Sequence, residues 1–484
     1  HILEVGSGSE GIARYLKRSV VGVDRSFAAP FNRWLHPVRG SILGLPFSDR
    51  AFDDVVCVDT LEHLDRGDRP RAIAELVRVA ASRVILSGPV GGFAEWGDAS
   101  YAEHIARRPR RVLPEWLQQH LVHGIPSLGD MLEALVGCGH RFTVGINEGV
   151  IQHYAALFAD NYSFMARFQG IHEDKFALEA PLARAKGDVP YSYLIAIDVA
   201  AGPAKPPEEP ECGEPRAAAP SRAGRAEIFA VGHRLDRMPE IPGVRRLLAG
   251  AGAGSRPGAG SGILCDDGGD SIAHRNADFS EMTAIYWVWR NVTGLDGVGF
   301  CHYRRYFDFR ADSAASRRET RLATAHDVTR HRSHFVDPSV VARTLETGAI
   351  IVTRTTEERM ANAEQYMVTH VPDHYLAMLN HLLARYPYLA RQLIAHVRDD
   401  GFYGNNMFVM RWADFDRLCR FWFDCLFALD RQIDARPAGY QRRVLAFLSE
   451  RLFDIHVRWL RDCGRQVVEY PLFFLEEPAL AGER

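Results

Sequence analysis

The segment from residue 200 to 226 reads AAGPAKPPEEPECGEPRAAAPSRAGRA and contains almost no large apolar side chain. Because it is rich in proline, alanine and charge, it cannot bury enough apolar surface to fold, and it is typical of a linker. It divides the 484-residue chain into two halves, each long enough for a domain. We therefore predict a first domain over residues 1–200, a linker over 201–225 and a second domain over 226–484.

The composition excludes several classes of protein. A net charge of −3 argues against a general nucleic-acid binder, which usually shows a basic excess. No apolar run approaches the ~20 residues of a membrane-spanning helix. The eight cysteines are scattered without a CxxC pair or a Cys/His metal spacing, so we expect reduced thiols in a cytoplasmic protein. The chain opens at His1 inside a strand-like segment, so we expect the first domain to lack its N-terminus.

Strand-like and helical segments alternate in the first half. This alternation predicts a parallel sheet in an α/β fold. The expected strands are HILEV, SVVGVD, DDVVCVD, RVILSGP, FTVGINEG and YSYLIAID, and the expected helices cover residues 11–17, 69–80 and 127–136.

A glycine turn follows the first strand. Gly6 and Gly8 let the backbone turn tightly and approach a ligand, and the letters also fit the dinucleotide pattern G-x-G-x-x-G. Glu4 stands where a carboxylate suits a cationic ligand, and Asp24 ends the second strand, where a carboxylate can accept ribose hydroxyls. These residues favour S-adenosylmethionine over a nicotinamide cofactor.

Together with SILGLPFSDRAFDDVVCVDTLEHL (residues 41–64), this half resembles the class I S-adenosylmethionine-dependent methyltransferases of the methyltransferase 11 type. The resemblance implies a Rossmann-like fold in which Glu4, Gly6 and Gly8 line the methionine part of the cofactor and Asp24 holds the ribose. Ile42 would flank the adenine and Asp59 would lie at the lip of the fourth strand. Ser41 departs from the acidic residue that the family often has there. By residue type, the candidate bases are His63, His104, His120 and His123.

In the second half, a helix is expected over DFSEMTAIYWVWRNV, with Asp278 and Glu281 as a capping box. Strands are expected at GVGFCHY and GAIIVT, and amphipathic helices over residues 364–385, 412–429 and 441–461. GVGFCHYRRYFDF places His302, Tyr303, Arg304 and Arg305 in a row at a strand end. Strand alternation predicts that the two arginines face opposite sides, one toward a ligand and one toward a carboxylate such as Glu281 or Asp308.

These blocks resemble the DUF4422 family of capsular polysaccharide and O-antigen glycosyltransferases, one branch of which is a galactofuranosyltransferase. The matching motifs are the Asp267–Asp270 turn, Asn276, the helix from Glu281, the strand end with His302, QYMVTHVPD with His370 and Asp373, and FYGNNMFVM with Asn405 and Asn406. The resemblance implies a GT-A-like α/β core with a helical C-terminal part.

Several residues of the second half are candidates for sugar transfer. Arginines suit a departing diphosphate, so Arg304 and Arg305 are candidates for charge stabilisation, with His302 beside them. Asp267, Asp270, Glu281 and Asp373 compete as catalytic carboxylates, and Asp400, near the Asn405-Asn406 loop, is a further candidate. An alternative is that the acidic run of Asp266, Asp267 and Asp270 is a metal-binding loop, because hard cations prefer carboxylate ligands. Metal dependence is left open. Candidate substrate contacts are Asn276, Tyr303, His370, Asp373, Asn405 and Asn406.

The predicted function is a bifunctional enzyme of bacterial surface-glycan synthesis. S-adenosylmethionine and a nucleotide sugar such as a UDP-sugar are the expected cofactor and donor. The expected partners are a glycan acceptor, free or lipid-linked, and other glycan-assembly enzymes. The expected location is cytoplasmic, with a peripheral position at the inner membrane face as an alternative. The alternative functions are a glycan-binding scaffold with an inert methyltransferase half and an NAD-linked sugar oxidoreductase.

Overall fold

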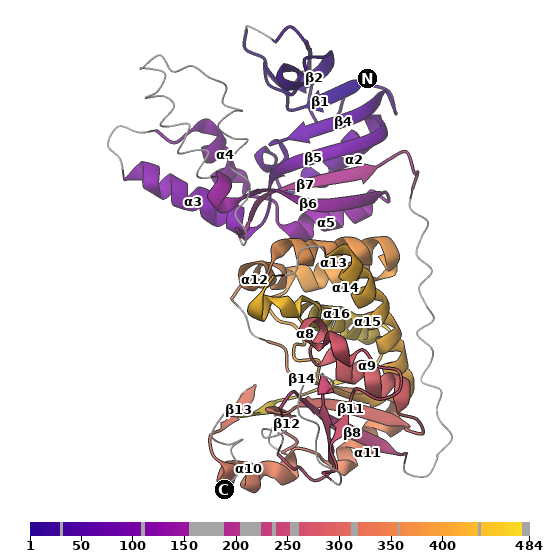
Figure 1. The fold of residues 1–484 in the computed structure, drawn as a ribbon. Helices are drawn as coiled ribbons and strands as arrows, with labels where there is room; N and C mark the ends of the chain where they lie inside the picture. Colours follow the sequence, from indigo (N-terminus) through magenta and orange to yellow (C-terminus); the bar gives the residue numbers. More distant parts are fainter. Residues whose placement is uncertain are drawn as a thin grey trace. The chain divides into compact units, whose positions relative to one another are not determined.

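The computed structural model describes residues 1–29, 32–107, 112–153, 188–203, 224–234, 239–251, 261–310, 318–356, 359–433 and 437–476. The chain divides into two compact units (Figure 1). The first consists of His1–Pro207 with Met360–Arg398, and the second of Glu208–Arg359 with Asp399–Arg484. Most of the predicted linker lies outside the described residues, and the boundaries drawn from the sequence stay a prediction.

A seven-stranded sheet forms the centre of the first unit, in the order β3-β2-β1-β4-β5-β7-β6. The first five strands in this order run parallel, and β7 runs antiparallel to both β5 and β6. All six predicted strands are present, and β3 is an addition. The strands are β1 (Ile2–Val5), β2 (Val20–Asp24), β3 (Leu35–Arg39), β4 (Phe52–Val58), β5 (Ala80–Pro89), β6 (Arg141–Gly149) and β7 (Pro190–Asp198).

Helices of the first half follow the apolar periodicity of the sequence. The helix α2 has Pro70 in its first turn and buries Ile73 and Leu76, which recur at helical spacing. Ser127 caps α5 by accepting a hydrogen bond from the Asp130 backbone N–H at 3.0 Å. The helices are α1 (Ala13–Leu16), η1 (Leu61–His63), α2 (Arg69–Val79), α3 (Gly92–Ala106), α4 (Glu115–His123) and α5 (Leu128–Gly137).

Three helices from the second half of the sequence complete the first unit: α12 (Asn362–Thr369), α13 (Pro372–Arg385) and α14 (Ala390–Arg398). The sequence predicted one helix from residue 364 to 385, but the chain breaks before Pro372, since proline disfavours a helical residue ahead of it. The Asn380 amide pairs with β6: it accepts from the Val144 N–H at 2.9 Å and donates to the Val144 carbonyl at 2.8 Å.

The second unit contains a ten-stranded mixed sheet. Its main path is β10-β9-β8-β11-β12-β17-β13, in which β10, β9, β8 and β11 are parallel, while β15 pairs antiparallel with β11. The strands are β8 (Ala226–Gly232), β9 (Val244–Leu248), β10 (Leu264–Cys265), β11 (Gly297–His302), β12 (Arg305–Phe307), β13 (Glu319–Leu322), β14 (Ile350–Thr353), β15 (Phe408–Arg411), β16 (Val467–Tyr470) and β17 (Leu472–Leu475).

Long helices pack with this sheet, and the C-terminal part of the unit is largely helical (Figure 1). The indole of Trp422 in α15 is fully buried and donates to the Ser449 carbonyl in α16 at 2.9 Å. The predicted α/β class with a helical C-terminal part is confirmed. The helices are η4 (Ala273–Arg275), α8 (Asn276–Phe279), α9 (Met282–Asn291), α10 (Ala325–His331), η6 (Arg332–His334), α11 (Pro338–Thr347), α15 (Trp412–Gln432), η8 (Gly439–Arg443) and α16 (Val444–Asp462).

The helix predicted from Asp278 is broken in the structure. Ser280 has a φ of 47°, which ends α8 and lets α9 begin afresh at Met282. No side chain caps α9 at Glu281, so the predicted capping box is wrong. The break frees the Glu281 carboxylate for a contact with another part of the chain, described below.

The structure bears on the predicted state of the cysteines and on membrane-spanning helices. Cys463, at the end of α16, is disulfide-bonded, so the expectation that every cysteine is a reduced thiol is wrong for this partly exposed residue. Across the described part of the chain, no helix combines the length and the apolar character that a membrane crossing requires.

Candidate functional site

The first candidate site is the glycine turn after β1. Gly6 and Gly8 have φ values of +80° and +52°, a backbone region that favours glycine. A Cβ added at Gly6 would lie 2.0 Å from Thr60 Oγ1, whereas a Cβ at Gly8 would meet nothing within 4 Å. Gly6 therefore allows the turn to pack against the segment after β4, and Gly8 borders open space that a ligand can occupy.

Two carboxylates hold this turn. Glu4 is only 5% exposed, and its Oε2 accepts from the Ile12 backbone N–H at 2.8 Å. Burial raises the pKa of Glu4 to about 7, because the charged form is poorly solvated there. Asp24 ends β2 and accepts from the Gly8 N–H at 2.9 Å. Their roles in holding a cofactor stay predictions.

Ile42 and Asp59 stand near the same edge of the sheet. Ile42 is buried in the segment after β3. Asp59 directly follows β4 with a φ of 44°, and its N–H donates to the Ser87 carbonyl at 2.9 Å. Burial raises the pKa of Asp59, and the charge of Glu148 adds to the effect. Because β1, β2 and β4 are parallel, their carboxyl ends bring these residues and the glycine turn to one edge.

A polar cluster lies just beyond Asp59. The Glu62 Oε1 atom is 3.9 Å from His63 Nε2 and 3.8 Å from His120 Nε2. His120 Nδ1 bonds to Asp98 Oδ2 at 2.7 Å, and the Tyr191 hydroxyl donates to Asp98 Oδ1 at 2.8 Å. Burial raises the pKa of Glu62 to about 8 and lowers that of His63.

The structure separates the four histidines that residue type alone grouped together. His63 and His120 belong to this cluster, with ring centroids 4.9 Å apart, whereas His123 bonds to the exposed Asp65 at 2.9 Å. His104 lies in α3. Sequence reasoning missed Glu62 and Asp98, because neither stands in a motif whose spacing indicates a contact with His120.

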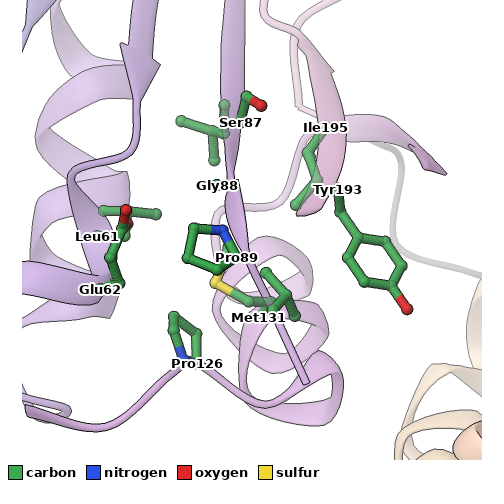
Figure 2. A pocket seen from close by; sticks show the side chains of 11 residues that line it. Leu61, Glu62, Ser87, Gly88, Pro89, Pro126, Met131, Tyr193 and Ile195 are labelled. Carbon is green, nitrogen blue, oxygen red and sulfur yellow. The ribbon is translucent and has the colours of Figure 1, made fainter. Parts of the chain in front are cut away.

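A small pocket opens beside this cluster. Figure 2 shows Glu62 on one side, Pro89 in the middle, and Ile195 and Tyr193 on the other side. Apart from Glu62 and a few small polar groups, its lining is apolar, with Met131 from α5 among the side chains. The pocket thus presents one carboxylate on an apolar wall.

The second candidate site begins at the end of β11. His302 pairs with Arg305 across a tight hairpin, so Tyr303 and Arg304 form its turn. The predicted continuous strand, with arginines on opposite faces, is therefore wrong. The guanidinium groups of Arg304 and Arg305 both lie over the Phe474 ring, at 4.7 and 5.2 Å from its centroid.

The carboxylates expected to pair with these arginines have other partners. Asp308 binds Arg310, whose Nε donates to its Oδ1 at 2.8 Å. Glu281 accepts from the Asn406 amide at 3.0 Å, and its other oxygen lies 3.8 Å from Arg443. Within the described residues, neither Glu281 nor Asp308 is therefore the partner of Arg304 or Arg305, and a pairing of one arginine with another carboxylate stays a prediction.

His302 is held against the loop before β15. Its Nε2 bonds to the Asn405 carbonyl. Burial lowers the pKa of His302 to about 4, and the charge of Arg305 adds to the effect. The ring is therefore neutral near pH 7. Tyr303, from the adjacent turn, packs edge-on against His233 with 5.3 Å between ring centroids.

Asn405 and Asn406 connect the hairpin to distant parts of the unit. Both have positive φ values, 70° and 49°, which asparagine tolerates better than most residues. Asn406 is 1% exposed and also donates to Ser449 Oγ at 2.9 Å, while the Asn405 N–H donates to Glu450 Oε1 at 3.0 Å. The structure thus brings Glu281, His302 and the asparagine pair together, and they are joined by Glu450.

Arg443 is a site residue that the sequence reasoning missed. It ends η8, its Nε donates to Ser280 Oγ at 2.6 Å, and its charge reaches both Glu281 and His302. Nothing in the surrounding letters separates it from the other arginines of the chain. Its contact with Ser280, at the break between α8 and α9, arises from the folded backbone and leaves no local pattern in the sequence.

The acidic turn that precedes α8 has structural partners. Asp270 is exposed, and it accepts from Tyr286 at 3.1 Å and Arg290 at 2.7 Å, which lowers its pKa. Asp266 is buried and accepts from the backbone of Gly250 and from Thr283. Asp267 lies between them, partly buried. These contacts tie the turn to α9, and the catalytic roles predicted for Asp267 and Asp270 stay predictions.

Three predicted substrate contacts remain. Asn276 begins α8 and donates to the Ser280 carbonyl at 2.8 Å and to Thr283 at 3.1 Å. His370 ends α12 and Asp373 lies in the first turn of α13, both in the first unit. A role for these residues toward a sugar stays a prediction.

Two family models match separate parts of the chain. Residues 3–87 match the family model of a methyltransferase domain, and residues 227–461 match that of the domain of unknown function DUF4422. The halves thus resemble the two families that their motifs indicated. No curated protein matches the chain.

Solved structures give further similarities. The bifunctional glycosyltransferase WbbM is 23% identical over 52% of this chain and 46% of its own, with a TM-score of 0.47. A methyltransferase from Methanosarcina mazei is 17% identical over 41% of this chain and 91% of its own, with a TM-score of 0.26. The magnesium protoporphyrin IX methyltransferase of Synechocystis is 15% identical over 40% and 73%, with a TM-score of 0.22. The chain thus spans less than half the length of WbbM, and the proposals below rest on the family models and the site geometry.

Proposed function

We propose that the chain is a bifunctional transferase of bacterial surface-glycan synthesis. The first half would transfer a methyl group from S-adenosylmethionine, and the second half a sugar from a nucleotide sugar such as a UDP-sugar. The acceptor would be a capsular or O-antigen polysaccharide or its lipid-linked precursor. The observation that carries the proposal is that each family-model match contains its own polar site, built around the residues that its motifs indicated.

The residues of the first site fit a sulfonium nucleoside. The space beside Gly8 leaves room for the cofactor, Glu4 offers a carboxylate for its cationic part, and Asp24 ends β2, where the ribose is expected. Ile42 would contact the adenine, and Asp59 would lie beside the methionine part. When bound, the cofactor supplies an electrophilic methyl group.

The protein would contribute mainly orientation to methyl transfer. In-line displacement requires the acceptor atom to be held behind the methyl group, and such positioning supplies much of the rate. The turn at Gly6 contacts Thr60, and the Glu62 cluster follows directly in the chain, at the edge where β1 and β4 end. We therefore place the acceptor at this edge, near the Glu62 cluster that borders the pocket of Figure 2.

The second site offers the charges that sugar transfer needs. Departure of a nucleoside diphosphate develops negative charge, which Arg305 and Arg443 beside His302 can stabilise. Glu281 and Glu450 are the carboxylates of this site, and the amide of Asn406 and the N–H of Asn405 fix one oxygen of each. A carboxylate held in this way suits the activation of an acceptor hydroxyl.

The proposal includes partners and a location. A lipid-linked acceptor would bring the enzyme to the inner membrane face, next to other glycan-assembly enzymes. A cytoplasmic location follows from the donors, since S-adenosylmethionine and nucleotide sugars are made there. Because both active sites are on one chain, the product of one reaction is released close to the other active site, which raises the effective concentration of that site.

Transfer of two labels tests the proposed function. The full chain is incubated with labelled S-adenosylmethionine or a panel of labelled nucleotide sugars and with lipid-linked glycan acceptors. We expect both labels in the glycan fraction, with methyl transfer lost in Gly8→Val and sugar transfer lost in Glu281→Gln. Absence of both labels across the panel would overturn the proposal.

Calorimetry separates the alternatives. Binding of S-adenosylmethionine or its demethylated product would contradict a scaffold with an inert first half. Binding of a nicotinamide dinucleotide at the same turn would favour the oxidoreductase instead. We expect binding of the sulfonium ligand alone, because Glu4 is the carboxylate that a cationic ligand requires.

A further inference from the structure

Three side chains at the end of β4 converge on one point. One ligand atom from each of Glu62, His63 and His120 lies within 4.8 Å of the other two, and Glu62 Oε1 faces the Nε2 atoms of both histidines. The first two residues come from η1 and the third from α4, so the group forms only when α4 packs against η1. Two imidazole nitrogens and one carboxylate oxygen are the donors that catalytic zinc sites use, with a fourth position left open.

The spacing of these atoms suits a metal ion after a small contraction. Zinc binds imidazole nitrogen and carboxylate oxygen at about 2.0–2.2 Å, which places neighbouring ligands roughly 3.4 Å apart in a tetrahedron. The two separations from Glu62 Oε1 are 3.8 and 3.9 Å. Each ligand atom therefore needs to move by less than about 1 Å, within the reach of a side-chain rotation.

Outer contacts orient the His120 ring for this role. Its Nδ1 bonds to Asp98 at 2.7 Å, and Asp98 is held in turn by the Tyr191 hydroxyl at 2.8 Å. Bonding of Nδ1 to a carboxylate directs the lone pair of Nε2 to the opposite side, toward Glu62. A carboxylate–histidine–metal arrangement of this kind fixes the tautomer and increases the basicity of the ligand.

Glu62 is the second, independent observation. Its side chain is 2% exposed, and among the described residues no hydrogen-bond donor reaches its Oε1. The neighbouring Arg69 does not supply one, because its Nε donates to the Leu61 carbonyl at 3.1 Å and one NH₂ group to the His123 carbonyl at 3.1 Å. A buried carboxylate oxygen that points at two imidazole nitrogens and has no hydrogen-bond donor in the described part of the chain would be stabilised by a cation bound between them.

We propose that Glu62, His63 and His120 bind a divalent first-row transition ion of the Zn²⁺ and Co²⁺ type, with Asp98 as a positioning residue. Hard ions such as Mg²⁺ prefer all-oxygen sites and would bind weakly here. The role of the ion rests on the proposed methyltransferase function: at its open position it would bind the acceptor hydroxyl and lower the pKa of that hydroxyl. Binding of the ion does not depend on that role.

Cobalt binding to the full chain tests the proposal. Protein stripped with a chelator is titrated with Co²⁺ and followed by visible absorption, and Zn²⁺ binding is measured by calorimetry. We expect one ion per chain, with the absorption of a four- or five-coordinate imidazole site. His63→Ala, His120→Ala and Glu62→Gln should each weaken binding at least 100-fold, and Asp98→Asn about 10–100-fold.

His36→Ala is the matched control, since this exposed histidine on β3 is far from the cluster along the sheet. It should leave binding unchanged. Circular dichroism checks each variant, and if His120→Ala does not fold, His63→Gln and Asp98→Asn carry the test. Wild-type protein that binds no ion, or binding that survives all three ligand substitutions, overturns the metal site. If metal-free protein still transfers the methyl group, the proposed methyltransferase function holds and only the metal site is wrong.

Discussion

The two candidate sites are built in different ways. In the first unit, Glu4, Asp24 and Asp59 each stand at or just beyond the end of a parallel strand, so the strand pattern alone places them at one edge. In the second unit, Glu281 and His302 meet through a turn of two asparagines that lies more than a hundred residues further along the chain. A site at strand ends is a property of the sheet, whereas a site made of turns depends on individual backbone conformations.

Burial shifts the pKa values of the two sites in opposite directions. It raises the pKa of the Glu4 carboxyl to about 7 and lowers the pKa of His302 to about 4, because in each case it disfavours the charged form. Both groups are thereby poised toward neutrality, one an acid and the other a base. Their opposite pH dependence offers a way to distinguish the two sites experimentally.

The largest expected effect concerns the glycine turn. Gly6→Ala should destabilise the first unit by about 2–5 kcal/mol, because a Cβ would clash with Thr60 and the positive φ adds strain. Gly8→Ala should cost only about 1 kcal/mol, since its Cβ meets no protein atom, yet it should abolish binding of S-adenosylmethionine. Denaturant unfolding and calorimetry measure the two effects.

Gly44→Ala is the control, because its Cβ also meets nothing and its φ is not positive. It should change neither quantity. Equal loss of stability in the Gly6 and Gly8 variants would show that the turn is strained as a whole, and that Gly8 does not border a ligand space.

The next effect concerns His302 and pH. Its pKa is lowered from 6.5 to about 4, so the unfolded chain takes up a proton before the folded one does. The stabilisation is fully present above pH 6.5 and is lost as the pH falls toward 4, by at most roughly 3 kcal/mol. His302→Gln should remove this part of the slope, as measured by denaturant unfolding at several pH values.

His456 also has a lowered pKa, about 3, but it is present in both proteins, so its contribution cancels in the comparison. Parallel stability curves for the wild type and His302→Gln would mean that His302 titrates normally and is not held by the Asn405 carbonyl.

The strand pattern explains how much could be predicted. The six expected strands of the first half are present because each is an apolar run bounded by turn residues, and this placed Glu4, Asp24 and Asp59 correctly at strand ends. Apolar periodicity likewise located the helices α15 and α16. Such signals are local, so one sequence is enough to see them.

The turns explain what could not be predicted. Ser280 breaks a helix whose letters fit a capping box, and Tyr303-Arg304 makes a hairpin inside a run that reads as one strand. In both places tertiary contacts outweigh local preference. Asp98 was missed for a related reason, because its contact with His120 joins two helices without any shared spacing.

A smaller effect is expected for Glu4 and cofactor affinity. A cationic ligand should bind the ionised carboxylate, and the pKa of Glu4 is about 7. As the pH increases toward 7, the affinity for S-adenosylmethionine should therefore increase by up to about tenfold per pH unit, and above pH 7 it should become constant. Glu4→Gln should bind more weakly and without this slope in calorimetry. Asp24→Asn is the comparison, since it removes another carboxylate that contacts the same turn but should keep the slope.

The smallest effect concerns the two arginines of the hairpin. Both stack on Phe474, so Arg304→Ala and Arg305→Ala should each cost about 0.5–1 kcal/mol of stability. They differ in their neighbours: the Arg304 Nε donates to the Leu475 carbonyl at 3.2 Å, whereas the charge of Arg305 lowers the pKa of His302. Only Arg305→Ala should raise the pKa of His302, measured by NMR on isotope-labelled histidine, and it should slow sugar transfer more than Arg304→Ala does. Equal and mild losses of transfer in the two variants would count against a direct role of either arginine at the diphosphate, and would leave Arg443 as the cation that serves the second site.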